Sequence, residues 1–122
     1  MAARQAIALV AGCWFAAAAL AQAPQPSLET GRRAARCTIV AGMAARAARS
    51  PQAREGSATM GRLMQKLALA AAPQQQFMAW LDEMEADLKA ADAKAMRAMV
   101  EDCQALVDEQ SEALDRLLSG EK

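Results

Sequence analysis

Residues 73–120 read PQQQFMAWLDEMEADLKAADAKAMRAMVEDCQALVDEQSEALDRLLSG, with no glycine or proline between the two ends. Mostly apolar residues recur along this stretch at helical spacing, in two stripes: Phe77, Leu81, Met84, Leu88 and Ala91, then Val100, Cys103, Val107, Gln110, Leu114 and Leu117. A single helix of about 45 residues would be roughly 67 Å long, about twice the length of the helix expected at the start of the domain. We therefore predict a break near residues 89–94 (KAADAK), with Asp92 as the cap of the second helix.

Two further helices are expected before this stretch. Ser27 is placed to cap a helix that begins at Leu28 and ends near Arg49, because the residue before Pro51 disfavours helix. The predicted inward residues of this helix are Cys37, Val40, Ala41, Ala44, Ala47 and Ala48. Residues 50–59 are expected to form a connection that holds at most a helical turn, since Gly56 is a helix breaker. The next helix is predicted to run to about residue 72, with an apolar stripe of Met60, Leu63, Met64, Leu67, Ala68 and Ala71.

The composition favours an all-α fold. Aromatic residues make up 3% of the 122 residues, tyrosine and histidine are absent, and β-branched residues are few. Alanine, leucine, methionine, glutamate and arginine, which are strong helix formers, dominate the chain. We expect one domain over residues 28–122, a small antiparallel four-helix bundle. The alternative is three helices, of which the last is long and forms a dimer through its protruding end.

The first residues match the pattern of a secretory signal. Arg4 precedes an apolar run that ends in Ala19-Leu20-Ala21, an A-x-A site, so we predict a signal peptide at residues 1–21, cleaved after Ala21. Residues 22–27 would then be an extended tether, and the protein would be periplasmic or secreted. Three alternatives remain: a retained transmembrane helix, a buried N-terminal helix, and a lipoprotein acylated at Cys13 of VAGC (residues 10–13).

Export decides how the later cysteines are interpreted. In an oxidising compartment, Cys37 and Cys103 are predicted to form a structural disulfide. Closing a loop of about 66 residues stabilises a fold by roughly 4 kcal/mol in the chain-entropy model. A redox-active pair is not favoured, because neither cysteine lies in a C-x-x-C motif.

Charge is divided between the two halves of the chain. Residues 24–72 carry eight basic and two acidic residues, whereas residues 73–122 carry five basic and twelve acidic residues. We expect the halves to pack together with complementary charges at their edges. The alternative is a basic face that binds an anionic membrane, made of Arg32, Arg33, Arg36, Arg46, Arg49 and Arg54. No aromatic residue is interleaved with these arginines, so nucleic-acid binding is not expected.

The sequence offers little chemistry for catalysis. Without histidine there is no imidazole base or metal ligand, and neither a G-x-G-x-x-G motif nor a P-loop is present. The acidic cluster of residues 82–87 is interpreted as a solvated face. The methionine pairs Met60–Met64 and Met96–Met99 suit core packing, with Cu(I) binding as the alternative.

We therefore expect a non-enzymatic exported protein without catalytic, cofactor or metal residues. It would act through contact with an unidentified protein, as an adaptor, a chaperone-like factor or an envelope accessory. A homodimer is compatible with this expectation.

The intact mass of the protein recovered from an exporting bacterial host tests the compartment. We expect a chain that begins at Gln22 and whose mass rises by about 2 Da on reduction, because one disulfide takes up two hydrogens. A species that begins at lipidated Cys13 would show an envelope lipoprotein instead. An uncut chain with free thiols would contradict both the export and the cysteine predictions.

Overall fold

The structure, a computed structural model, describes residues 25–120. Within this range the chain is all-α, as predicted, with five helices and no strand. The helices are α2 (Leu28–Ala47), α3 (Pro51–Ala71), α4 (Gln74–Ala90), α5 (Ala93–Glu109) and α6 (Ser111–Ser119). The predicted signal peptide, its cleavage site and Cys13 lie outside the described residues. Among the described helices, none combines the length and the apolar character that a membrane span requires.

Short polar side chains begin three of these helices. The Ser27 hydroxyl accepts a hydrogen bond from the Thr30 amide at 3.1 Å, at the start of α2. The Ser50 hydroxyl accepts one from the Ala53 amide at 3.1 Å, at the start of α3. Asp92 accepts one from the Ala95 amide at 2.8 Å, which confirms the predicted break and its cap. The alternative of one continuous last helix is therefore wrong.

Two helix boundaries differ from the predictions. Residues 51–59 are helical, because the Ser50 cap and Pro51 at the first helical position start α3 well before Met60. Gly56 lies inside this helix, where its cost of about 1 kcal/mol relative to alanine is tolerated. A further break at Gln110 separates α5 from α6, so the described chain has five helices instead of four. This change of direction brings α6 against α3.

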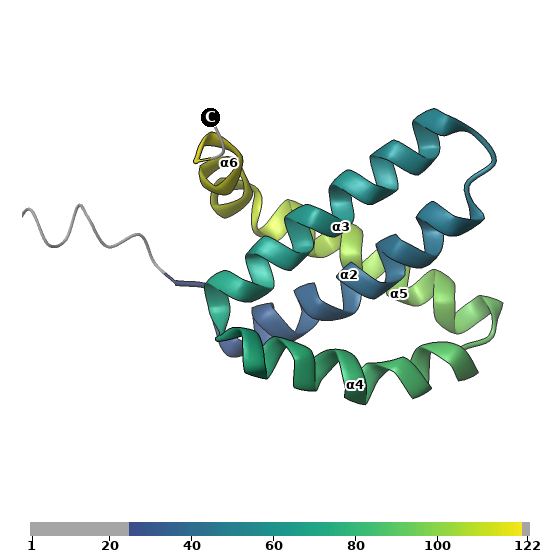
Figure 1. Cartoon of the computed structure of the whole chain (residues 1–122), viewed down its shortest axis with the longest axis horizontal. Coiled ribbons are helices and arrows are strands. Elements are labelled where there is room, and N and C mark those ends of the chain that lie inside the picture. The colour runs from purple at the N-terminus through teal and green to yellow at the C-terminus, as the bar shows by residue number, and fades with distance from the viewer. Residues whose placement is uncertain (1–24, 121–122) are drawn as a thin grey trace, which may run out of the picture.

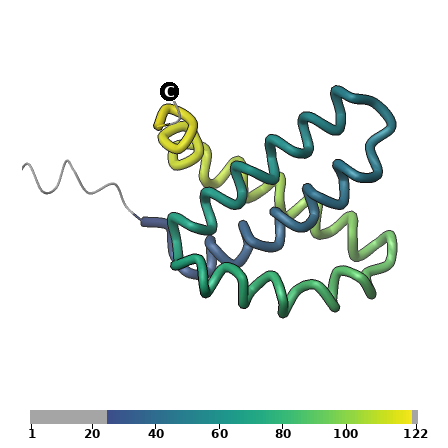
Figure 2. The backbone as a smooth tube through the Cα atoms, viewed as in Figure 1, coloured from purple at the N-terminus to yellow at the C-terminus, as the bar shows by residue number. Residues whose placement is uncertain are grey.

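The central element of the fold is α2. It forms an antiparallel hairpin with α3, and it also contacts α4 and α5 (Figure 1). Successive helices from α2 to α5 run in roughly opposite directions, and α5 crosses behind α2 in this view. The α2–α3 turn and the α4–α5 turn lie at the same end of the molecule, away from α6 (Figure 2). The end of the α2–α3 hairpin is therefore not covered by α6.

Small residues allow α2 to lie close to its neighbours. Gly31, Ala34 and Ala35 of α2 are buried, as are Leu67 and Ala68 of α3. A Cβ atom at position 31 would lie 2.6 Å from the Cβ of Ala71, which real Cβ contacts essentially never show, and 3.3 Å from the ring of Trp80, which is tighter than most of them. Gly31 is thus required where α2, α3 and α4 meet.

The predicted inward face of α2 is correct for only half of the helix. Cys37, Val40 and Ala41 are buried, but Ala44 and Ala47 are exposed and Ala48 is half-buried. The reason is that α5 crosses α2 near Cys37, and the last turns of α2 continue beyond this crossing. Two buried side chains of the last half of the chain, Trp80 and Leu106, lie outside the predicted stripes.

Substitution of two glycines with alanine tests the close approach at α2. Gly31→Ala should lower the free energy of unfolding by about 1–3 kcal/mol, because the added methyl group overlaps Ala71. Gly56→Ala is the matched control, since nothing lies within 4 Å of its added Cβ. It should raise the same free energy by about 0.5–1 kcal/mol through helix propensity. Urea denaturation measures both, and a neutral Gly31→Ala would contradict the packing described.

Candidate functional site

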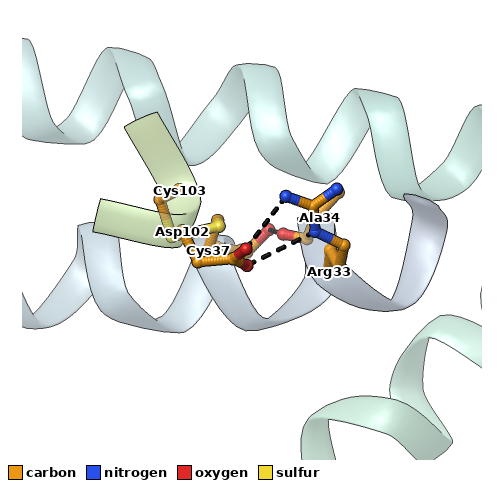
Figure 3. The surroundings of a disulfide bond; sticks show 6 residues. Arg33, Ala34, Cys37, Asp102 and Cys103 are labelled. Carbon is orange, nitrogen blue, oxygen red and sulfur yellow. Dashed lines mark hydrogen bonds and ion pairs between the residues drawn. A yellow bond between two sulfur atoms is a disulfide. The ribbon is translucent and has the colours of Figure 1, made fainter. Parts of the chain in front are cut away.

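A disulfide joins the middle of α2 to the middle of α5. Cys37 and Cys103, the predicted pair, are bonded with a Cα–Cα distance of 5.6 Å across 66 residues of sequence (Figure 3). Both cysteines are buried. Of the 17 residues of α5, only Cys103 and Leu106 are buried. Met96, Met99 and Val107 pack partly buried against the core, so the covalent bond adds to a limited apolar contact of α5.

An ion-pair cluster lies beside the disulfide. The Arg33 guanidinium of α2 donates to both carboxylate oxygens of Asp102, at 2.9 and 3.4 Å, and to Glu109 at 2.6 Å. Both acidic residues belong to α5, so this cluster is a second link between α5 and α2. Figure 3 shows the Arg33–Asp102 pair beside the disulfide. The hydrogen bonds from Arg33, first to Asp102 and then to Glu109, raise the pKa of its guanidinium above the ordinary value. A quarter of the Arg33 side chain is exposed, which makes the pair with Asp102 less screened than a surface pair.

An open groove of about 590 Å³ lies between the α2–α3 hairpin and α5. Its lining residues are small or apolar on the hairpin side and mixed on the α5 side: Cys37, Val40, Ala41 and Ala44 from α2, Gly56, Ser57 and Met60 from α3, and Val100, Cys103, Gln104, Val107 and Asp108 from α5. The two disulfide cysteines belong to this lining. The groove therefore lies at the place where the covalent bond holds two helices together.

Two of the predicted surface arginines are paired with the acidic half of the chain. Arg33 binds Asp102 and Glu109, and Arg32 lies 3.5 Å from Glu83 of α4. These pairs place complementary charges at the edges of the two halves. Of the remaining arginines, Arg36 is half-buried, while Arg46, Arg49 and Arg54 are exposed at the end of the α2–α3 hairpin. The basic face proposed from sequence is therefore reduced to this end of the hairpin.

The acidic cluster of α4 is exposed to solvent, and most of the methionines pack in or against the core. Asp82, Glu83, Glu85 and Asp87 are all exposed on α4. Among residues 25–120, no group of three or more histidine, cysteine, aspartate or glutamate side chains is arranged to hold a metal ion. Met64 and Met84 are buried in the core, and four further methionines pack against it: Met43, Met60, Met96 and Met99. Met60 also lines the groove, whereas Met64 does not.

Sequence reasoning missed the groove, although a signal for it was present. Ala41 and Ala44 follow the inward face of α2 at helical spacing, which indicates an apolar surface wherever no neighbour covers it. Gly56 and Ser57 were expected in a loop, and only the early start of α3 makes them the opposite wall. The position of Val100 and Val107 depends on the crossing of α5 over α2, which no local pattern specifies.

The lining determines what the groove can do. Alanine, valine and methionine side chains offer apolar contact, and Gln104 and Asp108 add polar groups on the α5 side.

Comparisons of the chain with protein-family models, with curated proteins and with solved structures gave no match.

Replacement of two neighbouring arginines with glutamine tests the ion-pair cluster. Arg33→Gln should lower the free energy of unfolding by about 1–2 kcal/mol, because charge-assisted hydrogen bonds to two carboxylates are lost. Arg32→Gln is the matched control, and its exposed pair with Glu83 should contribute less than about 0.5 kcal/mol. Chemical denaturation of the oxidised protein measures both. Equal losses in the two variants would contradict the role given to Arg33.

Proposed function

We propose that this protein is an exported, non-catalytic factor of the bacterial cell envelope that acts by protein–protein contact, as an adaptor or a chaperone-like accessory. The contact surface is the groove between α2, α3 and α5. The observation that carries the proposal is the apolar lining of this open groove, where Ala44 and Val100 remain exposed. Isolated apolar side chains are common on surfaces, and a hollow that gathers several of them is a candidate interaction site.

The size and the walls of the groove favour a helical segment as its occupant. A volume of about 590 Å³ lies in the range of ligand-binding pockets, about 300–1,000 Å³. Ala41, Ala44, Gly56 and Ser57 have small side chains, so the backbone of a partner helix can approach closely. Amphipathic helices bind such grooves through apolar residues at helical spacing.

The disulfide supports both the export and the surface. Structural disulfides persist in oxidising compartments, in agreement with the signal pattern at residues 1–21. The bond also fixes α5 relative to α2 before a partner arrives, and a pre-organised surface loses less conformational freedom on binding.

The two alternative functions have weaker support. Binding to an anionic membrane would have to rest on the three exposed arginines of the hairpin end, because Arg32 and Arg33 already pair with carboxylates. Copper binding would need methionine sulfur atoms gathered at one accessible site, but Met64 and Met84 are buried in the core. Protein contact uses the groove and needs no rearrangement of these residues.

Photo-crosslinking in an exporting bacterial host tests the proposal. A benzoylphenylalanine that replaces Ala44 should give discrete protein adducts, because this residue is exposed and lines the groove. The same probe in place of Ala86 is the matched control, since Ala86 is exposed on α4 outside the groove. Adding Val100→Asp, which places a charge on the groove wall, should remove the adducts formed from position 44.

Identical patterns from positions 44 and 86 would show that the groove has no special role. Turnover of a substrate by the purified protein would contradict the non-catalytic assignment.

A further inference from the structure

We propose that the groove binds a second copy of this chain, in a two-fold dimer in which α5 of each copy lies against the α2–α3 hairpin end of the other. This inference rests on the proposed function, since it takes the groove to be a protein-contact surface and names its occupant. The apolar centre of the groove, the basic end of the hairpin and the acidic residues of α5 support it.

The apolar centre is shared between the two walls. Val100 of α5 is 38% exposed, Met60 of α3 is half-buried, and Ala44 of α2 is exposed. All three line the groove. In the monomer these side chains contact water, and a partner surface that covers them gains free energy in proportion to the apolar area removed from water.

The end of the α2–α3 hairpin, beyond the residues that line the groove, is basic. Arg46, Arg49 and Arg54 are exposed around the α2–α3 turn, with Glu55 as the acidic residue beside them. Within residues 25–120, the ion pairs found join other residues and do not include these three arginines. Their charges are thus available to an acidic surface.

The face of α5 beside the groove carries two acidic residues, Glu101 and Asp108, and one basic residue, Arg97. Glu101, Gln104 and Asp108 follow one another at i, i+3 and i+7, so they share a face of α5. Gln104 and Asp108 line the groove, and Glu101 is exposed one turn before Gln104. Arg97 lies one turn further toward the start of α5, outside the groove lining.

A two-fold contact requires a surface that is complementary to itself. In such a contact a residue i of one copy meets residue j of the other, and j meets i, so the surface must be complementary to itself. A basic end and an acidic helix on either side of an apolar centre satisfy this condition. A different protein would need its own acidic and basic regions at matching positions. A second copy of this chain already has both regions.

Charge-reversal variants of the purified, oxidised protein test the pairing by sedimentation velocity over a concentration series. The unmodified protein should show a concentration-dependent dimer that weakens as salt is added. Arg49→Glu and Asp108→Arg, each made alone, should weaken dimerisation roughly tenfold, because every dimer contains the contact twice and reversal turns attraction into repulsion. The double variant Arg49→Glu/Asp108→Arg should restore it.

Asp87→Arg is the matched control for Asp108→Arg, because it makes the same change of charge at an exposed position of α4. It should leave the dimer unchanged. Circular dichroism and the mass change on reduction verify that each variant is helical and disulfide-bonded.

Three results would overturn the inference: a protein that stays monomeric up to about 100 µM, a dimer indifferent to both reversals, or a double variant as weak as its parents. The crosslinking experiment tests the proposed function independently of the dimer. Adducts from position 44 with a different protein would still support the groove as a contact surface, and the absence of any adduct specific to position 44 would not.

Discussion

The covalent bond between Cys37 and Cys103 fixes where α5 crosses α2, and the second half of the domain depends on that crossing. Apart from Cys103, the one buried side chain of α5 is Leu106, which by itself contributes about 1.5–3 kcal/mol of apolar burial. The Arg33 cluster adds a partly exposed link beside the bond. Where α5 lies then determines where α6 can bury Leu114 against α3, and it also sets the width of the groove.

A second constraint acts in the first half of the domain, where small residues replace large ones. Gly31, Ala34 and Ala35 let α2 lie close to α3 and α4, so the core is thin but dense. Large buried side chains come mainly from α3 and α4: Met64, Leu67, Phe77, Trp80, Met84 and Leu88. Because alanine contributes little apolar area, the domain gains much from a bond that restricts its unfolded chain.

Local features of the fold could be predicted from the sequence, and tertiary features could not. The caps at Ser27 and Asp92 were predictable because each depends on one side chain and an amide three residues later. The helical state of Gly56 was not, since a cost of about 1 kcal/mol at one glycine is smaller than the contribution of a favourable start at Ser50 and Pro51. The pairing of Cys37 with Cys103 could be predicted, because these are the two cysteines that follow the predicted signal peptide. The groove could not be predicted, because one of its walls depends on the direction in which α5 crosses α2.

The Cys37–Cys103 bond connects the predicted oxidising compartment with the proposed contact surface. If the signal pattern directs the chain to an oxidising compartment, the Cys37–Cys103 bond forms there and adds a covalent link to the apolar and ionic contacts of α5. The groove has α5 as one wall and the disulfide in its lining, so the contact surface becomes rigid in the same step. In a reducing compartment the same sequence would lose this restraint on α5. The cross-link therefore connects the predicted export with the proposed protein contact in this small alanine-rich domain.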